Sequence, residues 1–90
     1  MNSIRDISDA PGRLQKAFGY VKRHYPRLEA EPRGYFSEGT TQVLSLLDNA
    51  GCEHQLRVFP RTWFHYHRVI RADGVPMKRA DAEAYMDLLR

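Results

Sequence analysis

The stretch CEHQLRVFPRTWFHYHRVIRADGVPMK, residues 52–78, determines the fold that we predict for this chain. Within it, residues 55–59 and 63–72 are rich in aromatic and β-branched side chains, which favour strands. Pro60 lies between the two segments and marks a turn. The hydrophobic period is close to 2 here, whereas it is close to 3.6 before Gly51, so the chain changes from helix to strand at this point.

A second turn and a short third strand are predicted to follow. Asp73 and Gly74 form a strong hairpin signal, because a type I′ turn needs positive φ at both of its central positions. Residues 75–78 would then form an edge strand, since Pro76 cannot donate a hydrogen bond to a ladder. These signals together predict a three-stranded antiparallel meander.

The segment before Gly51 predicts two helices. Asp9 can cap the first, Pro11 suits its first turn, and Pro26 ends it. Its apolar side chains recur at helical spacing: Leu14, Ala17, Phe18, Val21 and Tyr25. Residues 28–36 are predicted to be a loop. A second helix would begin at Ser37, bury Val43, Leu46, Leu47 and Ala50, and end at Gly51.

A last helix is predicted over residues 79–89, so the expected order is α-α-β-β-β-α. The class is α+β, with the helices packed on the sheet. The 90 residues leave room for one domain, residues 1–90, and residues 1–8 are predicted to be a flexible segment. The N-terminus has no apolar run typical of a signal peptide, and no segment is long and apolar enough to span a membrane.

Cysteine usage and motifs limit the functional classes. Cys52 is the single cysteine, which favours a cytoplasmic protein without an internal disulfide. No Gly-rich phosphate loop, nucleophile elbow or metalloprotease motif is present, so we expect a protein that is not an enzyme and needs no cofactor.

Four potential metal ligands depend on how the two long strands pair. Cys52, His54, His65 and His67 have the i, i+2 spacing of one strand face and would suit zinc. A two- or four-residue loop at Pro60 would bring His54 near His67 and close that site. A three-residue loop, residues 60–62, is favoured because it collects six apolar side chains on one face: Leu56, Val58, Phe64, Tyr66, Ile70 and Met77. We therefore predict no metal, unless metal binding outweighs that difference.

The favoured register leaves basic and aromatic side chains on the outward face. The net charge is +3, and the cations are segregated from the acids. Arginine and lysine neutralise phosphate, while tryptophan and histidine stack on bases or contact their edges. The predicted interface consists of Arg57, Trp63, His65, His67, Arg71, Lys78 and Arg79, with Lys16, Lys22 and Arg23 as auxiliary phosphate contacts. Packing of this face beneath the first helix is the alternative.

We therefore expect a small bacterial or phage-like regulator that binds DNA or RNA. The alternative is a protein-binding adaptor or inhibitor that offers the same face, or the edge strand, to an acidic protein surface. A homodimer formed through this face is also open.

Two families have a similar order of elements. Residues 64–89 resemble the sheet-plus-helix domain with which phage integrases enter a DNA groove. The order α-β-β-β-α from Ser37 is similar to that of a double-stranded-RNA-binding domain, whose last helix opens with lysines, here Lys78-Arg79-Ala80. The chain lacks that family's glycine-rich approach to the helix. Both resemblances imply nucleic-acid binding.

Overall fold

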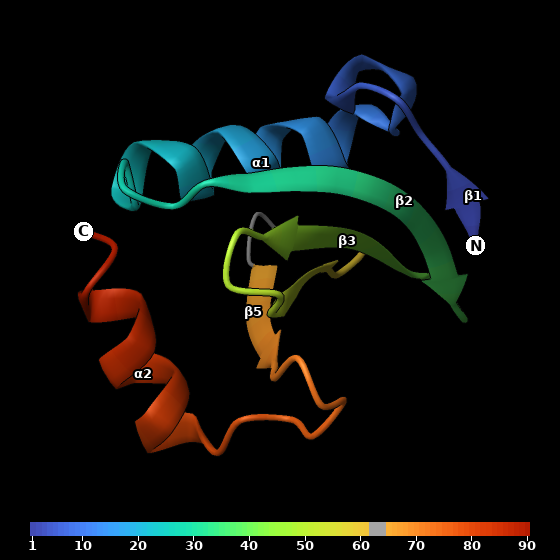
Figure 1. Ribbon diagram of the computed structural model, residues 1–90. Helices are drawn as coiled ribbons and strands as arrows, with labels where there is room; N and C mark the ends of the chain where they lie inside the picture. The colour runs from blue at the N-terminus through green and yellow to red at the C-terminus, as the bar shows by residue number, and fades with distance from the viewer. Residues whose placement is uncertain (62–64) are drawn as a thin grey trace.

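The computed structural model describes residues 1–61 and 65–90, with His65 described by its backbone alone. Two α-helices and an antiparallel sheet make up the domain, so the predicted α+β class is confirmed (Figure 1). The elements in chain order are β1 (Asn2–Ser3), the 3₁₀ helix η1 (Ile7–Asp9), α1 (Gly12–His24), β2 (Ala30–Glu38), β3 (Thr41–Asp48), β4 (Glu53–Val58), β5 (His65–Ile70) and α2 (Arg79–Asp87).

The sheet has five strands in the order β1-β2-β3-β4-β5, each antiparallel to its neighbour. The prediction of a three-stranded meander was therefore wrong in the number of strands. Residues 28–36, predicted to be a loop, contain most of β2, and the helix predicted from Ser37 to Gly51 is replaced by the hairpin of β2 and β3. The likeness to a double-stranded-RNA-binding domain depended on that helix and is lost with it.

The apolar run of β3 explains this error. Val43, Leu44, Ser45 and Leu46 are all buried, because β3 is the central strand and both of its faces are covered by side chains. A short continuous apolar run in a central strand has the same composition as a buried helical segment, and periodicity cannot separate the two.

Tight turns connect the strands of this part of the sheet. Gly39 has φ +59, which suits the first central position of the two-residue turn between β2 and β3. In the turn between β3 and β4, the Asp48 carboxylate accepts hydrogen bonds from the N–H groups of Ala50 and Cys52, at 3.0 and 2.8 Å. Gly51, which we predicted to end a helix, has φ +87 in this turn.

The pairing of β4 with β5 differs from the predicted register. Leu56 pairs with His67 and Val58 with His65, so the connection covers residues 59–64 and even positions of β4 face odd positions of β5. The predicted three-residue loop was wrong because it assumed that Phe64 and Tyr66 must complete the core. Strand β3 supplies those apolar side chains instead, and Tyr66 is 51% exposed on the opposite face.

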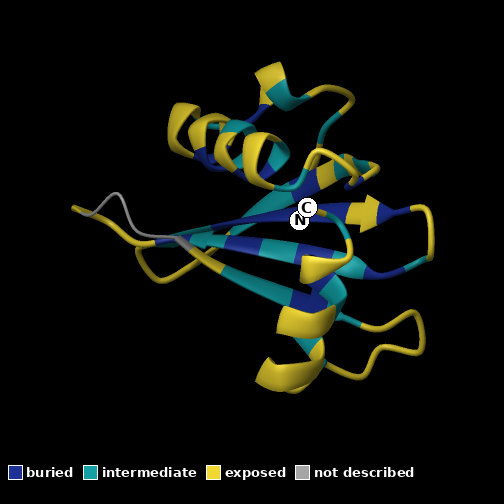
Figure 2. Cartoon of the chain, turned by 90° about the vertical axis from the view of Figure 1, so that its left-hand side faces the viewer, coloured by how far each residue is buried: buried dark blue, intermediate teal, exposed yellow. Residues whose placement is uncertain are grey.

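Helix α1 packs on the face of the sheet that carries Leu56 and Val58. Its buried residues Leu14, Ala17 and Val21 join that face in the main core (Figure 2). Pro11 precedes the helix as its N-cap residue. Asp9, which we predicted to cap α1, instead belongs to η1, where its carboxylate accepts from the N–H of the N-cap residue Asp6. Residues 1–8 contain β1, which pairs with β2, and the start of η1.

Helix α2 lies on the same sheet face, beside β5. Met86 packs with Val69 and Cys52 in a second, smaller cluster. The predicted helix over residues 79–89 is confirmed to within two residues. In the turn before it, Gly74 has φ +86 but Asp73 has no positive φ, so the type I′ turn predicted at Asp73-Gly74 is not formed. The third strand predicted over residues 75–78 is reduced to a single bridge between Ile70 and Pro76.

Candidate functional site

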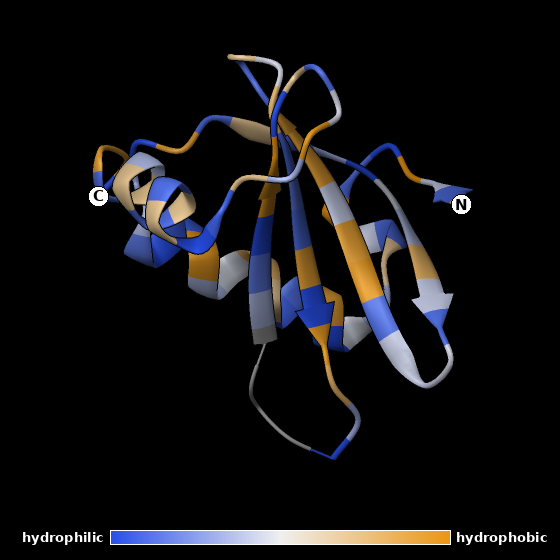
Figure 3. Cartoon of the chain, turned by 90° about the horizontal axis from the view of Figure 1, so that it is seen from below, coloured by the Kyte–Doolittle hydropathy of each residue, from blue (hydrophilic) through white to orange (hydrophobic). Residues whose placement is uncertain are grey.

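The structure separates the residues that we predicted to share one basic face. Arg57 lies on the sheet face opposite the helices, which Figure 3 views with α1 behind the strands. The register places His67 on the helix-bearing face instead. Trp63 and the side chain of His65 lie outside the described residues. The single aromatic and basic sheet face predicted from the sequence is therefore not formed by the described residues.

Three of the predicted cations form ion pairs within the fold. The Arg57 guanidinium donates two hydrogen bonds to the carboxylate of Glu38, and this contact lowers the pKa of Glu38 and raises that of Arg57. Arg71 donates to Asp73 at 2.7 Å, and Arg79 donates to Glu83 at 3.0 Å. Each of these arginines already faces a carboxylate, so part of its positive charge is compensated within the fold.

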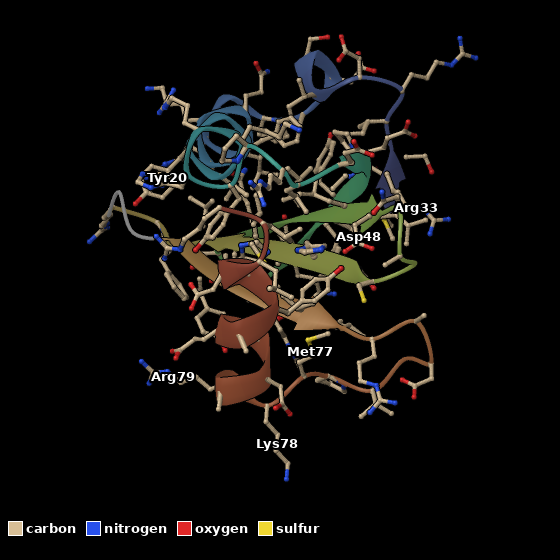
Figure 4. The ribbon with its side chains drawn as sticks, turned by 60° about the vertical axis from the view of Figure 1, so that its left-hand side comes forward. Tyr20, Arg33, Asp48, Met77, Lys78 and Arg79 are labelled. Carbon is tan, nitrogen blue, oxygen red and sulfur yellow. The ribbon has the colours of Figure 1, made fainter. Side chains whose placement is uncertain are left out.

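Lys78 and Arg79 lie where helix α2 begins. Lys78 is the N-cap residue, and both side chains point away from the body of the molecule (Figure 4). Cations at a helix N-terminus are unfavourable to the helix dipole, and Asp81 in the first turn offsets part of that effect.

The auxiliary cations lie together on helix α1. Arg13, Lys16, Tyr20 and Arg23 are exposed and follow one another at spacings of three and four residues, which is one face of a helix. We call these four residues the basic row. Tyr20 also contacts His24, with the ring centroids 4.0 Å apart. Arg27 is exposed just beyond the end of α1 and continues the positive surface.

Helix α1 contains no carboxylate, and its last turn carries Lys22, Arg23 and His24. Cations near a helix C-terminus stabilise the helix dipole. The Lys22 ammonium also donates to the carbonyl of Leu28, beyond the end of α1, at 2.7 Å. Lys22 therefore supports the fold, and Arg13, Lys16 and Arg23 carry the outward charge.

A separate group of polar side chains is buried between the sheet and α2. Asp48 at the end of β3 is 5% exposed, and His54 on β4 is fully buried. His54 Nε2 lies 2.8 Å from Asp48 Oδ2, and the hydroxyl of Tyr85 on α2 donates to the same carboxylate oxygen. With the two turn N–H groups, four donors surround the Asp48 carboxylate.

Hydrogen bonding extends this network to His67. His54 Nδ1 lies 2.8 Å from His67 Nε2. Because a carboxylate can only accept, His54 Nε2 carries a proton, and in neutral His54 the Nδ1 atom is then an acceptor. With neutral His54, His67 Nε2 is therefore the donor; with protonated His54, Nδ1 donates to His67 Nε2 instead. We call Asp48, His54 and His67 the relay.

Two members of this network have shifted pKa values. Burial raises the pKa of Asp48, but hydrogen bonds from Tyr85, His54 and the Cys52 N–H outweigh burial and hold the pKa below its usual value. Burial and the neighbouring Asp48 carboxylate raise the pKa of Tyr85. Asp48 is therefore a stabilised anion at neutral pH, and Tyr85 remains a protonated donor.

The zinc arrangement that we considered is formed only in part. The register that brings His54 near His67 does occur. However, both ring nitrogens of His54 already face Asp48 and His67, and the described residues contain no group of three or more His, Cys, Asp or Glu side chains placed to hold a metal ion.

A groove of about 510 Å³ runs beside this network, between β5 and α2. His67 forms part of its wall, with Tyr66 and Arg68 on β5 and Met86 and Arg90 at the C-terminal side of α2. The volume lies within the range of small-molecule sites. The groove is thus the place where the relay meets the surface.

Reasoning from the sequence missed Asp48 and Tyr85. Asp48 lies inside the segment predicted as a second helix, and Tyr85 lies inside the predicted last helix, and neither was considered as a site residue. The i, i+2 spacing of Cys52 with His54, and of His65 with His67, was the available signal, because it marks histidines that share a strand face.

No family model, curated protein or solved structure matches this chain. Among the described helices, none has the length and apolar character needed to cross a bilayer.

Proposed function

We propose that this protein is a non-enzymatic nucleic-acid-binding regulator of bacterial or phage type that acts in the cytoplasm and binds through the basic row of α1. The observation that supports the proposal is the charge distribution on this helix, which has exposed cations and no carboxylate. Arg57 on β4, Arg71 after β5 and Arg79 on α2 are each paired with an acid. The auxiliary contacts of the sequence prediction thus become the primary ones.

The dimensions of the basic row suit a phosphate backbone. Ten residues separate Arg13 from Arg23, which corresponds to about 15 Å along a helix. A duplex presents several phosphates over that length, and lysine and arginine gain affinity by releasing the counterions condensed on them. Tyr20 lies between Lys16 and Arg23, and its ring contacts that of His24, with the centroids 4.0 Å apart.

Salt-dependent binding tests this proposal. Fluorescence anisotropy with labelled duplex DNA, duplex RNA and single strands should show binding that weakens steeply as salt rises. The double variant Lys16→Ala/Arg23→Ala should reduce the slope of log K against log salt by about two units, because two phosphate contacts are lost.

The matched control removes two cations that are paired within the fold. Arg71→Ala/Arg79→Ala changes the net charge by the same amount but should leave the slope within about half a unit of the original. Equal effects of the two double variants would mean that net charge alone drives binding. Absence of binding at low salt would reject the nucleic-acid proposal.

A protein-binding adaptor is the second candidate, because the sheet face opposite the helices carries exposed apolar and aromatic side chains. Tyr66 is 51% exposed and Leu47 is 36% exposed on this face. Binding of a protein partner there would depend weakly on salt and would be reduced by Tyr66→Ala. Lys16→Ala/Arg23→Ala would leave such binding unchanged, so the same set of variants separates the two functions.

A further inference from the structure

The sheet face opposite the helices carries a row of four side chains that crosses the strands near the end of β3. The register pairs Glu31 with Leu47 and Leu47 with Glu53, and Ile70 pairs with Glu53 at the end of the row. Directly paired residues share one face of a sheet, so these side chains are neighbours. Leu47 is 36% exposed, Glu31 is exposed, and Glu53 and Ile70 are half-buried. We call these four residues the acidic row.

The two carboxylates of the acidic row have no cationic partner among the described residues. Glu53 accepts hydrogen bonds from the hydroxyl of Ser45 at 2.9 Å and from the amide of Gln55 at 3.0 Å, and both donors are neutral. None of the ion pairs in the described part of the chain involves Glu31 or Glu53. The acidic row therefore presents one negative charge on each side of an exposed leucine.

The basic row of α1 has the complementary order of side chains. Tyr20 is 44% exposed and lies between Lys16 and Arg23, which are exposed on the same helix face. Seven residues separate Lys16 from Arg23, which corresponds to about 10 Å along a helix. Two strand spacings separate the two carboxylates of the acidic row, which is also about 10 Å. A cation, an aromatic ring and a cation on α1 thus match an acid, a leucine and an acid on the sheet.

The two rows lie on opposite sides of the molecule. Helix α1 covers one face of the sheet with Leu14, Ala17 and Val21, so its basic row points away from the sheet. The acidic row lies on the other face, which Figure 3 views with α1 behind the strands. One chain cannot bring its own two rows together, so their contact needs a second copy. Because the two surfaces differ, the contact is heterologous and can be repeated from copy to copy.

We propose that the acidic row is the docking site for helix α1 of a second copy of this chain. In this contact Lys16 and Arg23 lie beside the two carboxylates, and Tyr20 lies against Leu47. Opposite charge and equal spacing of the two rows favour this occupant. One helix face on one row of a sheet is a small interface, so self-association should be weak and should decrease as salt rises.

Sedimentation velocity at low salt, at protein concentrations from micromolar to millimolar, tests the proposal. The weight-average mass should rise with concentration without stopping at a dimer, and it should fall towards that of a monomer when salt is added. A monomeric mass at every concentration overturns the proposal. Growth that stops at a dimer overturns it as well, because it shows a closed contact between identical surfaces.

Charge reversal identifies the two surfaces. Lys16→Glu/Arg23→Glu and Glu31→Lys/Glu53→Lys should each abolish self-association, because each variant places like charges opposite one another. An equimolar mixture of the two variants should restore it, since every row then meets a row of opposite charge. A mixture that stays monomeric overturns the proposal. Glu31→Lys alone changes only an exposed side chain and should weaken self-association about fivefold, so the test does not depend on the half-buried Glu53.

The matched control reverses two acids on α2. Glu83→Lys/Asp87→Lys changes the net charge by the same amount as Glu31→Lys/Glu53→Lys, but it lies outside both rows. This control should retain most of the wild-type self-association. Loss of self-association in the control to the same extent would show that net charge alone separates the copies, and it would overturn the proposal.

The basic row is also the surface that we propose for nucleic acid, so duplex binding should dissociate the assembly. That regulatory consequence rests on the proposed function, whereas self-association is measured without nucleic acid. Glu31→Lys/Glu53→Lys should lose self-association and keep the salt slope of duplex binding. A chain that self-associates but binds no duplex rejects the proposed function alone, and a chain that binds duplex but stays monomeric rejects this inference alone.

Discussion

The two halves of this domain are held together by different interactions. Among the described residues, the half under α1 is an apolar core of nine buried residues that includes Leu14, Leu44 and Leu56. In the half under α2, the structure describes three buried apolar residues, Cys52, Val69 and Met86, beside the hydrogen-bonded relay and Tyr85. One half is therefore stabilised mainly by burial and the other mainly by directed polar contacts.

The difference has consequences for stability and for function. Apolar contacts are non-directional and respond little to pH, whereas a buried polar network contributes only while each group keeps its partner. We therefore expect α1 to be a rigid support for its basic row and α2 to open at lower cost. The groove and the relay lie in that second half, where ligand sites are commonly found.

The largest effect should come from the apolar half. Leu56 is fully buried between α1 and the sheet, and Leu56→Ala removes its contacts and leaves a cavity. The free energy of unfolding should fall by about 3–4 kcal/mol. Urea denaturation followed by circular dichroism measures the change. Leu88→Ala, at a position that is 73% exposed, is the matched control and should stay within about 0.5 kcal/mol.

Disruption of the polar half should have a somewhat smaller effect. Asp48→Ala leaves His54, Tyr85 and two turn N–H groups without their acceptor, which should cost about 2–3 kcal/mol. Hydrogen exchange should show faster exchange in α2 while α1 stays protected. Equal loss of protection in both helices would show that the two halves unfold as one unit.

Asp48 should also make the stability of the fold depend on pH. The folded-state pKa of Asp48 lies below its unfolded value, so its contribution is present above pH of about 4 and is lost as pH falls through the folded pKa. The acid limb of wild-type stability should therefore be steeper than that of Asp48→Ala. Identical acid limbs would contradict the assignment of Asp48 as a buried anion.

The sequence predicted the helices better than the strands. The first and last helices were predicted correctly, because their apolar residues follow a single period and prolines or turn residues mark their ends. Strands β2 and β3 were missed, since Val43 to Leu46 are buried on both faces and show no alternation. An alternating hydrophobic pattern appears only when one face of a strand is polar, and a central strand that is buried on both faces has no polar face.

The candidate site could be predicted only in pieces. The cations at positions 16, 22 and 23 were recognised from charge segregation, which is visible without a fold. The relay could not be recognised, because its geometry depends on whether even positions of β4 face even or odd positions of β5. The sequence leaves both registers open. Because β3 supplies apolar side chains to the core, the register that pairs Leu56 with His67 does not reduce the buried apolar area.

A smaller effect is expected at Tyr85, which joins α2 to the relay. Tyr85→Phe removes the hydrogen bond to Asp48 and should cost about 1.5 kcal/mol at pH 7. The raised folded-state pKa of Tyr85 means that its contribution is full below pH of about 10 and declines as pH rises through the folded value. The variant should therefore lose less stability than the wild type between about pH 10 and 11. Tyr66→Phe, at an exposed position, is the control and should retain the wild-type decline.

The smallest effect is expected at Arg61, in the connection between β4 of the apolar half and β5 of the polar half. Arg61 has φ +65, a left-handed conformation that costs a non-glycine residue about 1 kcal/mol. Arg61→Gly removes that strain but adds entropy to the unfolded chain, so the net gain should be about 0.5 kcal/mol. Arg61→Lys keeps the strain and should leave stability unchanged. If hydrogen exchange shows the gain in β5 and α2 but not in α1, the two halves open independently; a gain shared by both helices would show that this connection couples them.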